Sequence, residues 1–217
     1  MNPDHTLNYI YNKYSIVSDE KMPIEIPNAG RADLARLLNE LNFEVGAEIG
    51  VANGVYSKQL CRANPRMKFY GIDAWETYGN YGDYSAETLA LYYDEVKKYF
   101  ASFPNYEIIK ESSMDAVNRF EDNSLDFVYI DANHTEPFIT QDIAEWSKKV
   151  RPGGIVSGHD YIKGIKAENG TRFFDVIKVT HKYTKANSIN PWFVLGLGNR
   201  IPGLVKDISR SWFWVKS

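Results

Sequence analysis

Several features that mark secreted, membrane or nucleic-acid-binding proteins are missing from this sequence. The 217 residues include one cysteine, Cys61, so no disulfide can form within the chain. No apolar run approaches the length of a membrane span, and the N-terminus lacks the basic and apolar segments of a secretory signal. The net charge of -3 gives no basic footprint for nucleic acid. We therefore expect a cytoplasmic protein that binds neither membranes nor nucleic acid.

The dinucleotide-binding fingerprint GxGxxG is also missing from the glycine-containing stretch at residues 45–54, VGAEIGVANG. Ala52 and Val55 stand where its second and third glycines would be. The stretch still predicts a strand, a tight turn and a helix, because Gly50 and Gly54 allow positive φ and a close approach of a ligand to the backbone. Unpaired N–H groups at the helix start would face that ligand. A nucleotide-type binding turn is the functional interpretation, and plain packing of a strand on a helix is the structural alternative.

Strands alternate with helices along most of the chain, which predicts an α/β fold with a parallel sheet and helices on both faces. Helical spacing of apolar residues is clearest at residues 31–41, 86–101 and 137–150. After the strand predicted within residues 45–54, further strand-like runs stand at residues 68–72, 106–110, 125–130 and 155–157. A helix is expected around residues 173–183, and an antiparallel pair of strands at residues 192–197 and 212–216. Trp212, Phe213 and Trp214 in the last strand indicate a buried or dimeric edge.

Two stretches predict little regular structure. Residues 1–28 are polar and interrupted by prolines, which favours an irregular cap with one helix around residues 7–16, placed over the active site or in a dimer interface. Residues 75–85, WETYGNYGDYS, indicate either a lid over the sheet or a surface insertion whose tyrosines pack on the next helix. We expect residues 1–30 to form the cap segment and residues 31–217 to form one catalytic domain.

Acidic residues follow four of the predicted strands. Glu48, Asp73, Asp131 and Asp160 each stand at a strand's carboxyl end, where α/β folds bind ligands. Glu48 would suit a cationic ligand better than a pyrophosphate. Asp73 is placed to accept hydrogen bonds from ribose hydroxyls, although a turn or helix cap is its alternative role. The four acids predict one ligand site at this edge.

The pattern ExGxxxG, filled by Glu48, Gly50 and Gly54, resembles motif I of the class I S-adenosylmethionine (SAM)-dependent methyltransferases. SAM carries an ammonium and a sulfonium but no phosphate. The segments FVYIDANH and RPGGIVSGHDY extend the resemblance to metal-dependent O-methyltransferases, including those that methylate sugar hydroxyls on macrolides, and to the methyltransferase domain 24 type. The resemblance implies a Rossmann-like fold with a seven-stranded, mostly parallel sheet and an antiparallel last strand.

The resemblance also implies a set of cofactor-binding residues. Ser112 and Met114 stand where this fold usually touches the adenine, while Ser113 also suits a helix N-cap. The full expected set is Glu48, Gly50, Ala52, Asn53, Gly54, Asp73, Ala74, Trp75, Ser112, Ser113, Met114 and Asp131.

Carboxylates at the ends of adjacent parallel strands, about 4.8 Å apart, can share one cation. Asp131 and Asp160, with His159 beside them, would hold a divalent metal such as Mg²⁺ or Mn²⁺, which would orient an acceptor hydroxyl and lower its pKa. His134 is the expected general base, with Asp131 beside it in the catalytic site. Where the metal-dependent relatives have two adjacent oxygen ligands, this chain has His159 before Asp160. Histidine is a poor Mg²⁺ ligand, so a different metal, an indirect role for His159, or no metal are all open.

The sequence thus favours a SAM-dependent methyltransferase that transfers a methyl group to an oxygen of a small-molecule hydroxyl, such as a sugar. A non-catalytic SAM-binding protein is one alternative, and an NAD-linked oxidoreductase, which needs a phosphate-friendly loop, is another. A homodimer is a further expectation.

Overall fold

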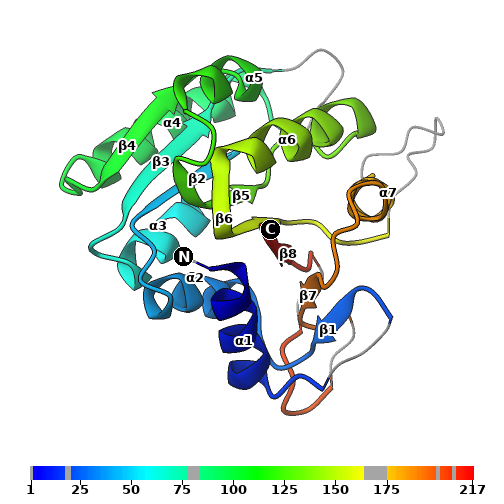
Figure 1. Cartoon of the computed structure of the whole chain (residues 1–217). Helices are drawn as coiled ribbons and strands as arrows, with labels where there is room; N and C mark the ends of the chain where they lie inside the picture. The colour runs from blue at the N-terminus through cyan, green and yellow to red at the C-terminus, as the bar shows by residue number, and fades with distance from the viewer. Residues whose placement is uncertain (1, 18–20, 78–83, 164–174, 199–200, 207–208) are drawn as a thin grey trace.

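The computed structural model describes residues 2–17, 21–77, 84–163, 175–198, 201–206 and 209–217. Its helices are α1 (Pro3–Tyr14), α2 (Arg31–Glu40), α3 (Val55–Ala63), α4 (Ala86–Phe100), α5 (Ser113–Ala116), the 3-10 turn η1 (Val117–Arg119), α6 (Glu136–Lys149) and α7 (Val176–Ala186). Its strands are β1 (Ile24–Ile26), β2 (Val45–Ile49), β3 (Lys68–Asp73), β4 (Tyr106–Lys110), β5 (Leu125–Ile130), β6 (Val150–Gly158), β7 (Phe193–Leu195) and β8 (Trp212–Val215). Figure 1 shows the helices arranged around one central sheet. Each helix in the described ranges is too short or too polar to cross a membrane.

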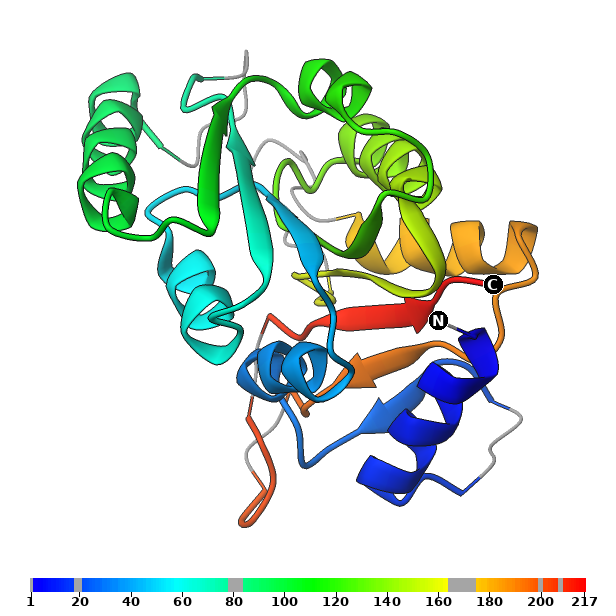
Figure 2. The same ribbon diagram turned by 60° about the vertical axis from the view of Figure 1, so that its left-hand side comes forward.

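The sheet follows the order β1-β7-β8-β6-β5-β2-β3-β4, and only β8 runs antiparallel to its neighbours. This confirms the predicted α/β fold with an antiparallel last strand. In the described residues the sheet has eight strands rather than the expected seven, because Ile24–Ile26 pairs with β7 and adds an edge strand (Figure 2). Strand β8 lies inside the sheet, so Trp212, Phe213 and Trp214 are buried in the core and do not form an edge.

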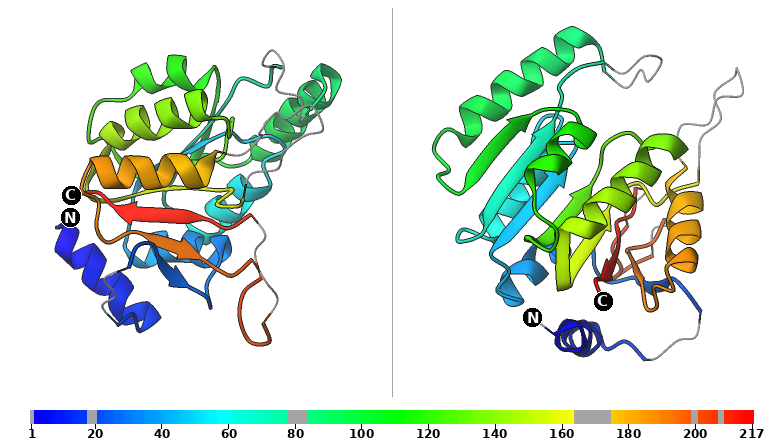
Figure 3. Two further views of the ribbon diagram at one scale, coloured as in Figure 1. Left: turned by 90° about the vertical axis from the view of Figure 1, so that its right-hand side faces the viewer. Right: turned by 45° about the horizontal axis from the view of Figure 1, so that its top comes forward.

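Two apolar layers hold the helices on the sheet. Alternate side chains of each strand point to opposite faces, so Tyr129 packs into one layer and Ile130 into the other. Helices α1 to α4 contribute to the first layer, and α5 to α7 contribute to the second. Figure 3 (left) shows α5 to α7 above strand β8 and α1 and α2 below it. The predicted helices on both faces are confirmed.

The N-terminal segment is more regular than expected. Helix α1 begins at Pro3, after the Asn2 side chain accepts a hydrogen bond from the backbone N–H of Asp4 at 3.0 Å. The Thr6 hydroxyl donates to the carbonyl of Gly153 at 2.8 Å, near the start of β6. Helix α1 therefore packs near the amino end of β6, and the predicted site lies beyond the other end of that strand. The division at residue 30 and the homodimer stay predictions.

Some expected boundaries moved. Strand β6 begins at Val150 rather than at residue 155, because the Pro-Gly-Gly turn continues as extended backbone into the strand. Residues 78–83 of the expected lid, and residues 173–174 of the expected last helix, lie outside the described residues. The helix itself begins at Val176.

Candidate active site

A cavity of about 630 Å³ opens beyond the carboxyl ends of β2 to β6. Most of the predicted site residues line it: Glu48, Gly50, Ala52, Asn53, Asp73, Ala74, Ser112, Ser113, Met114, Asp131, His134, His159 and Asp160. A parallel sheet places the ends of its strands side by side, which is why residues far apart in the sequence meet at this edge.

The glycine loop after β2 is held close to the end of β5. Gly50 has a φ of +89°, and a Cβ added there would overlap the carbonyl oxygen of Asp131. Its backbone N–H donates to the carbonyl of Ile72 at 2.8 Å. The structure therefore requires glycine here for a close contact between two backbone segments, a need distinct from the expected approach of a ligand.

Two of the expected cofactor residues do not line the cavity. Gly54 is the N-cap of helix α3 and has a φ of +73°, and a Cβ there would meet Val96 and Phe100 of α4. Trp75 is buried, and its indole N–H donates to the carbonyl of Ala52 at 2.8 Å. Both residues therefore stabilise the glycine loop without lining the cavity. Trp75 holds its backbone by a hydrogen bond, and Gly54 allows it to pack on α4.

Asp73 forms three hydrogen bonds within the fold. Its Oδ2 accepts from the backbone N–H groups of Val51 and Ala52, both at 2.9 Å, and its Oδ1 accepts from that of Trp75 at 2.7 Å. Burial raises the pKa of Asp73, and these three bonds oppose the rise. The carboxylate thus ties the glycine loop to β3, and only one side of Oδ1 is left to meet a ribose hydroxyl.

Glu48 is buried at the cavity wall and accepts a hydrogen bond from the Ser57 hydroxyl of α3. Burial raises the pKa of Glu48 to about 8; the Ser57 hydroxyl and the Arg31 charge lower it, while Asp131 raises it further. An ionised carboxylate in this position is stabilised by a cation, which is the role that the sequence predicted for it.

The adenine-side residues differ from the expectation in one respect. The N-cap of α5 is Ser112, whose hydroxyl accepts from the Asp115 N–H at 3.2 Å, so the prediction of Ser113 as N-cap is wrong. Ser113 instead donates to the carboxylate of Asp142 and accepts from the indole N–H of Trp146 at 2.9 Å.

Asp142 also lines the cavity, and sequence reasoning missed it. Burial raises its pKa to about 6. The available signal was an acid on the inward face of a helix, beside Ile143 and one turn before Trp146.

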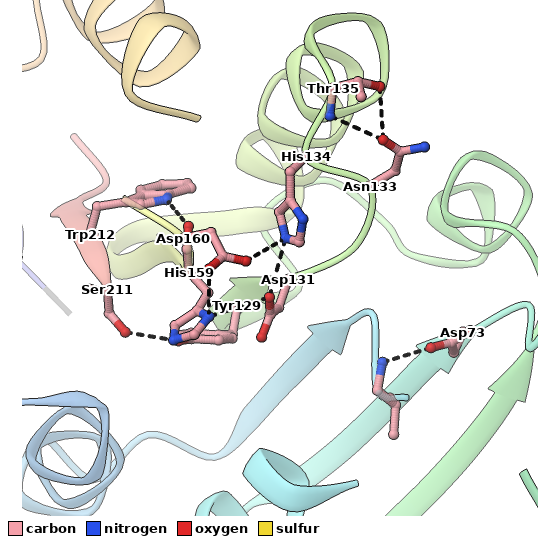
Figure 4. Close-up of polar contacts among 11 residues, drawn as sticks. Asp73, Tyr129, Asp131, Asn133, His134, Thr135, His159, Asp160, Ser211 and Trp212 are labelled. Atoms are coloured by element: carbon pink, nitrogen blue, oxygen red, sulfur yellow. Dashed lines mark hydrogen bonds and ion pairs between the residues drawn. The ribbon is translucent and has the colours of Figure 1, made fainter. Parts of the chain in front are cut away.

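Four titratable side chains meet where β5 and β6 end (Figure 4). The His134 Nε2 lies 2.9 Å from Asp160 Oδ2 and 3.4 Å from Asp131 Oδ1. The His159 Nδ1 lies 3.6 Å from an oxygen of each aspartate. The figure shows these side chains pointing toward one another, with Asp73 set apart. The predicted catalytic and metal-ligating residues therefore form one cluster.

The two carboxylates control the charge of both histidines. Burial by itself lowers the pKa of His134, but hydrogen bonds to Asp131 and Asp160 outweigh it and raise the value to about 9. The same balance raises the pKa of His159 to about 10. Burial would raise the pKa of Asp160, yet the histidines hold it well below its usual range. Without a bound cation, the two carboxylates thus favour the protonated form of both imidazoles.

The backbone at Asp160 is strained, with a φ of +53° in the left-handed region. A non-glycine residue there costs on the order of 1 kcal/mol, although aspartate tolerates the region better than most residues do. The conformation directs the carboxylate to His134.

One ligand atom each from Asp131, His134 and Asp160 lie within 4.8 Å of one another. This set differs from the expected one, since His134 takes the place of His159. Two carboxylate oxygens and an imidazole nitrogen suit Mn²⁺, Fe²⁺ or Zn²⁺ better than Mg²⁺. The residues present therefore fit a divalent cation.

Comparison with known proteins identifies the family. A family model described as a methyltransferase domain, Methyltransf_24, matches residues 47–161, from β2 to the segment after β6. The match covers more than half of the chain, and the chain belongs to this family of class I SAM-dependent methyltransferases. The NAD-linked oxidoreductase interpretation is thereby set aside.

Solved structures share the fold at low sequence identity. A candidate caffeoyl-CoA O-methyltransferase from Staphylococcus aureus superposes with a TM-score of 0.61 at 14% identity, covering 97% of this chain and 91% of that one. The O-methyltransferase from Bacillus cereus in complex with SAH has a TM-score of 0.58 at 14% identity, covering 98% and 91%.

The CurJ carbon methyltransferase has a TM-score of 0.60 at 10% identity, covering 87% of this chain and 54% of that one. No curated protein matches the chain. Because the similar folds include both oxygen and carbon methyltransferases, the fold does not determine the accepting atom. The protein is a methyltransferase whose cofactor is SAM.

Proposed function

We propose that this protein transfers the methyl group of SAM to the oxygen of a small-molecule hydroxyl, such as that of a sugar, with His134 as the general base. The main support for this proposal is the position of His134 in the cavity wall, where its Nε2 lies beside the carboxylates of Asp131 and Asp160. An imidazole beside two carboxylates is oriented by them, and its protonated form is stabilised once it has taken a proton.

The strand order supports an orientation for the cofactor. From β6 to β4, the cavity edge presents the cluster of Asp131 and Asp160, then Glu48, then Asp73, and then the residues after β4 that begin with Ser112. The family resemblance assigns the adenine to this last group and the ribose to Asp73. The methionyl end would then lie near Glu48, and the reactive methyl group would face the cluster.

Asp131 and Asp160 would share a divalent cation through their carboxylates, which supports metal assistance and leaves the His134 imidazole to act as the base. When bound, the cation would polarise the acceptor hydroxyl. It would also compete with the imidazole for the carboxylate oxygens, which would favour the neutral imidazole that a general base requires. His134 and Asp160 are buried beside the cavity, and the low dielectric of a buried position strengthens each charge interaction that they make with the acceptor.

The test is a methyl-transfer assay on metal-stripped protein, with labelled SAM and a panel of sugars, polyols and catechols, repeated with Mg²⁺ and with Mn²⁺. We expect turnover on a hydroxyl acceptor that depends on the added cation. The variant H134A should lower kcat by roughly 10²- to 10⁴-fold, because it removes the general base, and should leave the affinity for S-adenosylhomocysteine (SAH) unchanged.

The matched control is H5A, which removes an exposed histidine of α1. Its turnover should equal that of the wild type. Turnover of H134A within twofold of the wild type would remove His134 as the base. Absence of transfer to every acceptor, with SAH bound normally, would favour the non-catalytic SAM-binding alternative.

A further inference from the structure

The cavity is acidic apart from its histidines and one basic residue. Among the described residues that line it, Arg31 is the only Lys or Arg. The acids of the wall are Glu48, Asp73, Glu76, Asp131, Asp142 and Asp160. A permanent positive charge in such a wall indicates a ligand that carries a negative group at that point.

Arg31 is held at the Glu48 side of the cavity by its contacts with α3. It is the first residue of α2, and its backbone carbonyl accepts a hydrogen bond from the Tyr56 hydroxyl at 3.0 Å. Its guanidinium carbon lies 5.3 Å from the centre of the Tyr56 ring, and that ring packs on Tyr129 of β5 at 4.3 Å. The Arg31 charge also lowers the pKa of Glu48, against the larger effect of burial. These contacts place the guanidinium beside Tyr56, close enough to Glu48 to affect its charge.

No carboxylate in the described part of the chain lies within 4.0 Å of the Arg31 guanidinium, although the wall around it is acidic. Its partial burial and its contact with Tyr56 limit where the side chain can turn. An arginine fixed in this way and facing a cavity is arranged to bind a planar anion through two parallel N–H bonds.

The methionyl end of SAM is a zwitterionic amino acid, with an ammonium and a carboxylate on one carbon atom. We propose that Arg31 binds this carboxylate while Glu48 receives the ammonium. The assignment rests on the cofactor orientation in the proposed function. Helix α2 and strand β2 then supply opposite charges to the two ends of one amino acid group, and together they select a ligand that carries both.

The experiment is calorimetric titration of the wild type and of R31M with three probes. These are SAH, decarboxylated SAH, and 5′-methylthioadenosine, which lacks the amino acid group. Methionine keeps an apolar stem to pack on Tyr56 and removes the charge. We expect R31M to bind SAH roughly 10- to 100-fold more weakly and to bind methylthioadenosine within about twofold of the wild type. R31M should no longer prefer SAH over decarboxylated SAH, whereas the wild type should.

The control is R36M on the same helix, where an exposed arginine pairs with Asp33; its SAH affinity should not change. Normal SAH binding by R31M would overturn the role of Arg31 and leave the cofactor assignment intact. Equal weakening for SAH and methylthioadenosine would also overturn it, because Arg31 would then act by shaping the pocket through Tyr56. Failure of the wild type to bind SAH at all would overturn both this role and the proposed function.

Discussion

Asp73 and Asp160 stand at the same edge of one sheet, yet they have different partners. The partners of Asp73 are three backbone N–H groups of the glycine loop and of the turn after β3. The partners of Asp160 are the imidazoles of His134 and His159, which face the cavity. The first carboxylate holds the loop in shape, and the second holds groups that can exchange protons and ligands. The position at a strand end therefore places an acid in the site, and its partners decide what it does there.

The largest effect is expected at the histidine-linked acid. The variant D160N should lower methyl transfer by roughly 10²- to 10³-fold, because the carboxylate that orients His134 and would hold the cation is lost, while the Kd for SAH stays within about threefold. The measurement is turnover beside calorimetric binding of SAH. D94N, on the exposed face of α4, is the control. If D160N turned over at nearly the wild-type rate, Asp160 would have no role in methyl transfer, and the proposed contrast with Asp73 would be wrong.

The second effect concerns the loop that Asp73 holds. G50A should destabilise the fold by about 2–4 kcal/mol, because the added methyl group would overlap the Asp131 carbonyl at a positive φ. The melting temperature should fall by roughly 5–15 °C. G198A is the matched control, since a Cβ there meets nothing within 4 Å. An unchanged melting temperature for G50A would contradict this prediction, because the ends of β2 and β5 could then move apart at no cost in stability.

The third effect separates the two acids directly. D73N replaces one accepting oxygen by an amide NH₂ group, so at least one of the three backbone N–H groups that Asp73 binds loses its partner, which should cost about 2 kcal/mol of stability. We also expect about tenfold weaker SAH binding, in contrast to D160N. Calorimetry and chemical unfolding measure both. If D73N kept its stability and lost only turnover, Asp73 would act in the reaction as Asp160 does, and the contrast between the two acids would be wrong.

The smallest effect is a pH dependence from Glu48, the acid that lies between these two. Burial raises its pKa to about 8 in the folded protein, whereas in the unfolded chain its pKa has the ordinary, lower value. At a pH between these two values, Glu48 is protonated in the folded state and ionised in the unfolded state. Stability of the ligand-free protein should therefore fall as pH rises toward 8, by about 1–2 kcal/mol between pH 6 and pH 8. E48Q should lose this part of the slope in urea unfolding, and an identical slope in both proteins would contradict the assignment.

Local patterns predicted most of the elements because their causes are local. The apolar spacing of α2, the buried run of β5 and the glycine turn after β2 are each complete within one stretch of sequence. Strand β1 was missed because three residues between Pro23 and Pro27 carry a weak signal, and its partner β7 is far away along the chain. The start of α1 had a usable signal in Asn2 and Pro3, which is a common way to begin a helix.

The sequence by itself determined the α/β layering, the glycine turn and the row of acids at strand ends, since hydrophobic period and chain order are enough to place them. Only the tertiary structure decided which groups meet. It brought His134 between Asp131 and Asp160, tied Asp73 to the loop, and carried Arg31 to the side of Glu48 through the packing of α2 on α3. These contacts depend on distances and orientations set by many residues at once, which no short stretch of sequence contains.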